Sequence, residues 1–329
     1  MIVDAHNDLL LELSWREDEG EENPFVEHWL PKLEAGGVEL QVCPVYVEVQ
    51  YLPDAALRAA LKQAATFWRI VAANSGVRPV LSRADLEGDG LGLMLSLEGV
   101  EPLGSDPGLL DSFVRLGVRM IGLTWNRRNT FADGAGEPGG LSILGRALLA
   151  RFAEVGVVLD LAHASEQTFS DALEYAGGAQ IVVSHACCRA VLDSPRNISD
   201  EQLGALAERS GVLGIMALPS VVDPSSPTLE RLIDHVDHAV EVMGIEHVGL
   251  GGDFIRQLFA SGATRISARE RSFAPPHLEL GRGLDELHGP HQYPDLVAAL
   301  RRRGYEGERL EAILRGNFLR VFREALPAS

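Results

Sequence analysis

The feature that most constrains this chain is an alternation of short apolar runs with amphipathic segments, which repeats eight times along its length. Such alternation is typical of a parallel sheet built from βα units. The expected strands are Ile2–His6, Val38–Val47, Gly92–Leu97, Val118–Thr124, Val157–Leu161, Gln180–Val183, Val212–Ala217 and His247–Gly251. Eight units favour a closed (β/α)8 TIM barrel. An open doubly wound sheet is the alternative, but no G-x-G-x-x-G turn follows the first run to support a dinucleotide site.

The segments between these runs carry apolar residues at three- and four-residue spacing, which predicts helices. The expected helices are Ala55–Asn74, Leu144–Val155, Glu166–Tyr175, Asp200–Arg209, Leu229–Met243, Pro294–Arg303 and Glu308–Ala325. One long segment rich in Gly, Pro, Ser and Arg, residues 255–291, follows the last strand. Long loops in compact domains are usually functional or disordered, so we predict a lid over the barrel mouth. No linker or repeat divides residues 1–329, which we expect to form one domain.

Composition narrows the classes of function. The chain has 329 residues, of which 46% are hydrophobic and 23% charged, as in soluble globular proteins. Its formal charge of −18 would repel nucleic acids and anionic lipid surfaces, so neither is an expected partner. No apolar run reaches the ~18 residues of a membrane span, and Met1–His6 lacks a signal-peptide pattern, so we expect a cytoplasmic protein. Cys43, Cys187 and Cys188 lack metal-site or disulfide spacing and are expected to be buried thiols.

Side chains that can bind metal follow five of the eight predicted strands. They are His6 and Asp8 after the first strand, Glu98 after the third, His163 after the fifth, His185 after the sixth and Asp253 after the eighth. The loops at the carboxyl ends of barrel strands converge on one face, so these side chains should meet there. Nitrogen and oxygen donors without cysteine fit zinc, manganese or iron. Three histidines with several carboxylates exceed the needs of one four-coordinate ion, which predicts two ions that share a bridging carboxylate.

The bridge itself can be narrowed by elimination. Many binuclear barrel hydrolases use a carboxylated lysine, but this chain has only Lys32 and Lys62. Both fall on predicted helices or connections, not at strand ends. Glu98 is therefore the expected bridging ligand.

Eight short segments, in this order, resemble those of the membrane (renal-type) dipeptidase family, a branch of the amidohydrolase superfamily. They span nearly the whole chain. They are Asp4–Asp8, Leu97–Gly99, Leu159–His163, Ser184–His185, Pro195–Asn197, Gly251–Phe254, Tyr293–Leu296 and Asn317–Phe322.

The resemblance implies a binuclear zinc dipeptidase, although other divalent ions would also fit. In the family pattern His6 and Asp8 bind one ion, His163 and His185 bind the other, and Glu98 bridges them. A metal-bridging hydroxide would then attack the peptide bond of a dipeptide that has a free C-terminal carboxylate, including dipeptides with a C-terminal D-residue. Zinc makes such a nucleophile available near neutral pH because it lowers the pKa of water from 15.7 to roughly 7.

The resemblance also implies roles around the metals. Asp253 matches a carboxylate that shuttles a proton to the departing amine, and Arg196 matches the residue that clamps the substrate carboxylate. The match fails at Trp125, where the family has a histidine thought to polarise the scissile carbonyl. Trp has one donor and no acid–base capacity, so oxyanion stabilisation and substrate range should change. We expect Trp125 and the following Asn126 to contact substrate, with simple packing at the barrel mouth as the alternative for Trp125.

Two other functions remain open at this stage. The same metals would support another amidohydrolase activity, such as hydrolysis of N-acyl amino acids or lactones. A catalytically silent barrel that binds a ligand or protein would lack metal on analysis. A homodimer is expected by analogy with the family alone. His235 and His238 lie three residues apart on a predicted helix, and we expect them on its solvated face.

Overall fold

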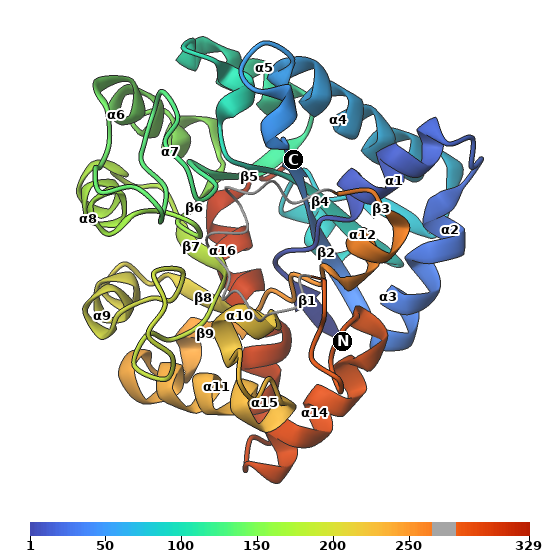
Figure 1. Ribbon diagram of the computed structural model, residues 1–329, viewed down its shortest axis with the longest axis vertical. Coiled ribbons are helices and arrows are strands. Elements are labelled where there is room, and N and C mark those ends of the chain that lie inside the picture. Colours follow the sequence, from blue (N-terminus) through green and yellow to red (C-terminus); the bar gives the residue numbers. More distant parts are fainter. Residues whose placement is uncertain (265–280) are drawn as a thin grey trace.

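The computed structural model describes residues 1–264 and 281–329. Eight parallel strands form a closed barrel with helices around it, as Figure 1 shows in a view down the barrel. The ring consists of β1 (Ile2–Asp4), β2 (Val38–Tyr46), β4 (Leu91–Glu98), β5 (Val118–Gly122), β6 (Val158–Asp160), β7 (Ile181–Ala186), β8 (Val212–Ile215) and β9 (Val248–Leu250). The pairings of β1 with β9 and of β2 with β4 close the ring. The TIM-barrel prediction is confirmed, and an open sheet is excluded.

A ninth strand, β3 (Val77–Pro79), was not expected from the sequence. It pairs with residues 91–93 at the start of β4, and β5 pairs with β4 from residue 95 onward. Three residues, one of them proline, give too short a pattern to be recognised as a strand. The strand lies outside the closed ring and does not alter the barrel.

Helices cover the outside of the barrel, and one of them, α16 (Asn317–Ala325), closes its amino-terminal end. They are α1 (Leu9–Asp18), α2 (Pro24–His28), α3 (Leu30–Gly36), α4 (Ala56–Ala73), α5 (Leu110–Arg115), α6 (Ile143–Leu149), α7 (Phe152–Val155), α8 (Glu166–Tyr175), α9 (Asp200–Glu208), α10 (Pro219–Val222), α11 (Leu229–Met243), α12 (Arg256–Ser261), α14 (Tyr293–Arg302), α15 (Gly307–Glu311) and α16 (Asn317–Ala325). Local sequence sets several helix starts. Ser199 and Gln202 form a reciprocal capping box at α9, and Ser165 caps α8. Among the described residues, no helix is long and apolar enough to cross a membrane.

The amino-terminal end of the barrel is filled by apolar side chains and closed by α16. Phe318 and Phe322 of this helix pack against inward-facing residues such as Met94 and Val182. The fit depends on Gly249, because a Cβ there would lie 2.5 Å from the Phe318 ring. Asn317 anchors the helix start by donating hydrogen bonds of 2.7 Å to two carbonyls around the start of β9. This end of the barrel is therefore closed and tightly packed.

The predicted lid is only partly irregular. Its first residues form helix α12, and its last part contains the buried residues Leu284 and Leu287, which pair with each other. Residues 265–280, including His277, lie outside the described residues. Movement of this segment stays a prediction.

The prediction for His235 is wrong. This side chain is fully buried on the inner face of α11, where its Nδ1 accepts a hydrogen bond of 3.0 Å from the Cys188 backbone. Its neighbour Val236 is also buried, so the apolar face of the helix is wider than the spacing indicated. His238 lies nearer the surface and pairs with Asp200 at 2.8 Å. All three cysteines are free and buried, as predicted.

Candidate metal centre and substrate pocket

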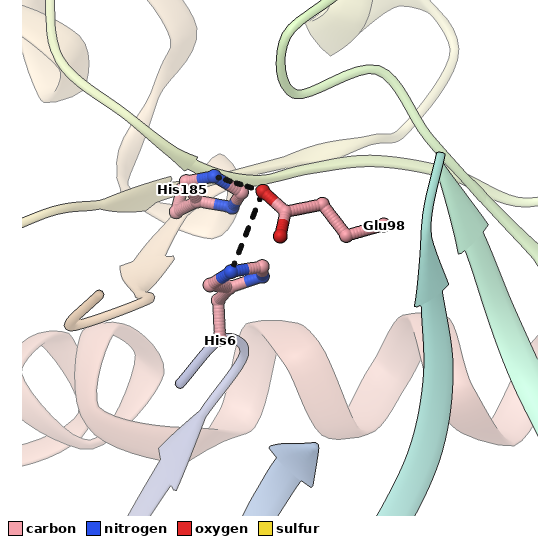
Figure 2. Close-up of side chains that lie close together, drawn as sticks. All are labelled: His6, Glu98 and His185. Atoms are coloured by element: carbon pink, nitrogen blue, oxygen red, sulfur yellow. Dashed lines mark ion pairs between the residues drawn. The ribbon is translucent and has the colours of Figure 1, made fainter. Parts of the chain in front are cut away.

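The side chains predicted to bind metal converge at the carboxyl ends of the strands. Glu98 ends β4, and its Oε1 lies 2.8 Å from His163 Nε2, 3.6 Å from His185 Nε2 and 3.8 Å from His6 Nε2. Figure 2 shows His6 and His185 pointing toward this oxygen from two sides. One carboxylate thus lies within 4 Å of all three histidines, at the place expected of a shared ligand.

Two groups of side chains within this cluster have the spacing of metal sites. His6, Glu98 and His185 form one group, and His6, Asp8 and Asp253 form the other, with ligand atoms within 4.8 Å of one another in each. The nearest oxygens of Asp8 and Asp253 lie 3.9 and 4.0 Å from His6 Nε2. Neither lysine belongs to these groups, since Lys32 lies on α3 and Lys62 on α4.

Hydrogen bonds behind His185 determine which ring nitrogen faces the centre. The Ser184 hydroxyl donates its single hydrogen to Asp160 at 2.5 Å, so it accepts the hydrogen bond of 2.8 Å from His185 Nδ1. His185 therefore carries its hydrogen on Nδ1, and its Nε2 lone pair points into the cluster. An outer hydrogen bond that sets the tautomer in this way is the usual arrangement for a metal-binding histidine.

His163 has the same tautomer through a different partner. Its Nδ1 donates to the side-chain oxygen of Asn126 at 2.8 Å, which leaves Nε2 with a lone pair. The Nε2 atoms of His163 and His185 are 2.8 Å apart, and both face the carboxylate of Glu98. Two lone pairs and a carboxylate oxygen that converge in this way suit a bound cation.

Several buried atoms of the cluster lack a hydrogen-bond partner among the described residues. They are both ring nitrogens of His6, Oδ1 of Asp8 and Oε2 of Glu98. Each buried polar atom left in this way costs about 1–3 kcal/mol, so native proteins retain few of them. Coordination of divalent ions by nitrogen and oxygen donors accounts for the concentration of these atoms here. The residues therefore fit a metal centre.

Burial shifts the pKa of every ionisable group in the cluster toward its neutral form. It lowers the pKa of His6 to about 3, with a further effect from the Arg196 charge, so the ring is neutral and able to ligate. It raises the pKa of Asp253 to about 6, and raises that of Glu98 well above its ordinary value with the help of the Asp8 and Asp253 charges. A cation would reverse the direction for the carboxyl groups.

Backbone strain is concentrated in the same place. Among the described residues, three that are not glycine have positive φ, and two of them, His163 at +64° and Asp253 at +49°, lie in the cluster. Such conformations persist only where the surrounding structure imposes them, often at functional sites. The backbone of Gly251, two residues before Asp253, lies close to that of β7, because a Cβ at Gly251 would lie 1.9 Å from the Ser184 carbonyl oxygen.

A network of hydrogen bonds to the Asp4 carboxylate, not predicted from the sequence, supports the loops that carry the cluster. Asp4 is fully buried and accepts hydrogen bonds from the backbone of His6 at 3.2 Å and of Gly252 at 2.9 Å. The Tyr293 hydroxyl donates to the same carboxylate at 2.6 Å, and the Asn7 amide does so at 2.5 Å. The network ties the loops after β1 and β9 to α14. Asp4 and Tyr293 fall within the motifs that carry the family resemblance, which was the only available signal for them.

A cavity of about 180 Å³ opens above the cluster. Its lining includes Asp8, Leu11, Tyr46, Glu98, Trp125, Asn126, His163, Arg196, Leu218, Val221, Asp253, Ile255 and Leu258. Arg196, from the loop between β7 and α9, is 9% exposed, and its guanidinium donates to the His185 carbonyl at 3.2 Å. A buried cation beside the cluster is thus available to a ligand in the cavity.

Trp125 and Asn126, in the loop after β5, differ in what they contact. Trp125 stacks on His163 with ring centroids 5.6 Å apart and lies 5.6 Å from the Tyr46 ring. Asn126 is buried and holds His163 through its side-chain oxygen. Both line the cavity, so both can reach a ligand bound there. Their roles toward substrate stay predictions.

Comparisons with known proteins agree with the motifs. The family model described as membrane dipeptidase (peptidase family M19) matches residues 1–267 and 279–328. The chain is 32% identical over 237 residues to dipeptidase tcpJ of Claviceps purpurea, covering 70% of this chain and 50% of that protein. It is 29% identical over 339 residues to dipeptidase 3 of Rattus norvegicus, covering 98% and 64%. The chain thus spans about half to two thirds of the length of these relatives.

Solved structures share the fold. A metallopeptidase from Rhodobacter sphaeroides, bound to a phosphinate mimic of the dipeptide L-Ala-D-Ala, aligns with a TM-score of 0.81 at 23% identity over 98% of this chain and 99% of that one. A dipeptidase assigned to the same peptidase family aligns with a TM-score of 0.83 at 23% identity over 100% of this chain and 99% of that one.

Proposed function

The chain belongs to the membrane dipeptidase family, and from this premise we propose that it is a metal-dependent dipeptidase that hydrolyses dipeptides with a free C-terminal carboxylate at a centre of two zinc ions. One observation carries the proposal. The tautomer-fixed histidines His163 and His185 face the shared carboxylate of Glu98, beside the buried guanidinium of Arg196.

The two ligand sets are those that the family resemblance implies. His6 and Asp8 would hold one ion, His163 and His185 the other, with the Glu98 carboxylate between them. Ions bound there would polarise the scissile carbonyl and make water acidic enough to act as a nucleophile near neutral pH. Every other step falls to the side chains of the pocket.

Asp253 is suited to moving the proton. Its carboxylate lies 4.0 Å from His6 Nε2 and lines the cavity, within reach of a water and a substrate at the centre. A carboxyl group in such a position can act as general base and then as general acid. It would take the proton from the attacking water and deliver it to the departing amine nitrogen.

Arg196 would position the substrate. A guanidinium pairs with a carboxylate through two parallel hydrogen bonds, which orients as well as attracts it. The cavity of about 180 Å³ is smaller than the ~300–1,000 Å³ of pockets for drug-sized ligands, which favours a substrate of dipeptide size. The L-Ala-D-Ala mimic bound to the Rhodobacter enzyme supports including C-terminal D-residues among the substrates.

A second candidate function is the hydrolysis of N-acyl amino acids or lactones at the same metals. Trp125 favours it, because a missing donor to the carbonyl oxygen costs on the order of 10²–10³ in rate and activated carbonyls depend less on it. Replacement of Trp125 by His should therefore change the ranking of substrates and leave metal content unchanged. If the ranking stays the same, Trp125 serves packing alone.

The experiment that tests the proposal is a stereochemically complete dipeptide library, together with C-amidated and N-acylated analogues, applied to the zinc-loaded protein. The account expects turnover of free dipeptides and poor turnover of amidated ones. Hydrolysis of N-acyl amino acids or lactones without hydrolysis of any dipeptide would favour the second candidate.

A further inference from the structure

Five side chains form what we call the apolar wall of the cavity: Leu11, Tyr46, Trp125, Ile255 and Leu258. They pack as a cluster separate from the main core of the barrel, and all five line the cavity. They come from α1, the end of β2, the loop after β5, and the segment at α12. Because four separate parts of the chain contribute to it, the wall depends on the folded barrel and is not the face of a single helix or loop.

The wall is held in a defined position. Leu258 is 2% exposed, and Leu11 and Tyr46 are 8% exposed, although all three border the cavity. The guanidinium carbon of Arg127 lies 5.0 Å from the Trp125 ring centroid, and the Tyr46 ring lies 5.6 Å from it. Aromatic and cation–π contacts of this kind fix the indole plane. A ligand side chain would therefore meet a preformed apolar surface.

The order of strands sets the direction of a bound dipeptide. Around the closed ring, β2 lies four strands from β7 in either direction, so Tyr46 at the end of β2 faces the loop after β7 that carries Arg196. The metal-ligating side chains lie between these two sides. A dipeptide with its carboxylate at Arg196 and its scissile carbonyl at the centre must direct its N-terminal residue toward the apolar wall.

Charge on the wall side agrees with this direction. The carboxylate of Glu48, which follows β2, accepts a hydrogen bond of 3.1 Å from Thr264 in the lining of the cavity. Negative charge here suits the α-ammonium group of an N-terminal residue. The opposite side carries the Arg196 cation, with Leu218 and Val221 from the segment after β8.

We propose that the apolar wall makes this chain selective for dipeptides whose N-terminal residue has a large apolar side chain, such as leucine or phenylalanine. The inference rests on the proposed function and adds the class of substrate. A single methylene in an apolar pocket changes kcat/KM by roughly 10–200-fold, so the preference over N-terminal alanine should reach at least about tenfold. A charged N-terminal side chain would lose its hydration against the wall and be disfavoured.

The test compares two series of substrates on the zinc-loaded protein. The first varies the N-terminal residue in Leu-Ala, Phe-Ala, Ala-Ala and Asp-Ala, and the second varies the C-terminal residue in Ala-Leu and Ala-Phe. Leu11→Ala should reduce the Leu-Ala to Ala-Ala ratio of kcat/KM toward one. Trp125→Ala provides a second, partly exposed position should Leu11→Ala fail to fold. The matched control is Val221→Ala on the opposite side, which should alter the C-terminal series and leave that ratio high.

Each outcome decides the matter. A Leu-Ala to Ala-Ala ratio near one in the wild type, or a higher rate with Asp-Ala, would overturn the selectivity and leave the proposed function standing. An equal loss of the ratio in Val221→Ala and Leu11→Ala would show that the apolar wall does not determine it. Hydrolysis of no dipeptide at all would overturn both the selectivity and the proposed function.

Discussion

The two ends of the barrel are built from the same strands and differ in almost every physical respect. Met94 on β4 and Val182 on β7 face an apolar layer packed against α16, whereas Glu98 and His185, at the other ends of these strands, face the candidate metal centre. A few residues along one strand separate a side chain that stabilises the fold from one suited to chemistry. The barrel thus divides stability and function between its ends.

The two ends of the barrel also differ in whether their buried polar atoms have hydrogen-bond partners. At the amino-terminal end Asn317 donates two hydrogen bonds of 2.7 Å, and the helix that it begins buries its apolar face. At the carboxyl end, His6, Asp8 and Glu98 supply four of the eight buried side-chain atoms without a partner among the described residues. Bound divalent ions would satisfy these atoms, so in the proposed function this end of the barrel gives up stability for a site.

The largest expected effect comes from Glu98→Gln. Loss of the shared carboxylate should remove metal and with it several kcal/mol of transition-state stabilisation, on the order of 10³-fold or more in kcat/KM. The metal-free variant should nevertheless unfold at a higher temperature than the metal-free wild type. Burial raises the pKa of Glu98 in the folded state, so its carboxyl group lowers stability increasingly as the pH rises above its ordinary value of 4.5.

Thermal unfolding between pH 5 and pH 8, with metal content measured in parallel, checks this prediction. The difference between variant and wild type should widen as the pH rises from 5. A metal-free variant that unfolds at a lower temperature across this range would mean that Glu98 stabilises the fold itself.

At the amino-terminal end of the barrel, a substitution should lower stability and leave metal content and activity unchanged. Phe322 is fully buried and stacks on Phe318 with ring centroids 5.8 Å apart. Phe322→Ala should cost roughly 3–5 kcal/mol of the free energy of unfolding through lost burial and a cavity. Metal content and kcat/KM of the folded fraction should stay at wild-type values, as measured by denaturant titration and initial rates. A comparable fall in kcat/KM would break the separation between the two ends.

Arg196→Met tests the carboxylate clamp. Removing one partner of a buried, charge-assisted pair should reduce transition-state binding by about 2–5 kcal/mol, seen in kcat/KM for free dipeptides. The matched control is the C-amidated dipeptide, for which variant and wild type should be nearly equal. Wild-type kinetics of the variant on free dipeptides would remove Arg196 from the proposal.

A smaller effect is expected from Ser184→Ala, which removes the hydroxyl between Asp160 and His185. The tautomer of His185 would no longer be held, and metal affinity should fall about 10–100-fold, as for other outer hydrogen bonds of metal ligands. Competition with a chelator measures this affinity without reference to activity. Ser165→Ala is the control, since it removes a helix cap of α8 and should leave metal affinity unchanged.

Sequence reasoning recovered the parts of the molecule that depend on local pattern. All eight strands of the ring were expected, because each is an apolar run bounded by helical periodicity. Convergence of residues such as Glu98 and His185 followed from the rule that the carboxyl ends of barrel strands share one face. The short elements β3, α2, α3, α5, α10 and α12 were missed, since three to seven residues carry too little periodicity. Helix α1, with ten residues, was not predicted either.

Contacts between distant parts of the chain escaped prediction for a different reason. Tyr293 reaches Asp4 across 289 residues, and nothing local in either segment indicates the pairing. The burial of His235 likewise depends on what α11 packs against, and the hydrogen bond of Asn126 to His163 depends on how two loops meet. Such contacts are consequences of barrel closure, so only the folded structure reveals them.

The central claim is that the carboxyl end of the barrel is a binuclear metal centre shared through Glu98. Metal analysis of the purified, zinc-replete protein, combined with X-ray absorption or a crystal structure of that form, tests it most directly. The account predicts about two divalent ions per chain, both in contact with Glu98, and none in Glu98→Gln. One ion or none in the zinc-replete wild type would contradict it.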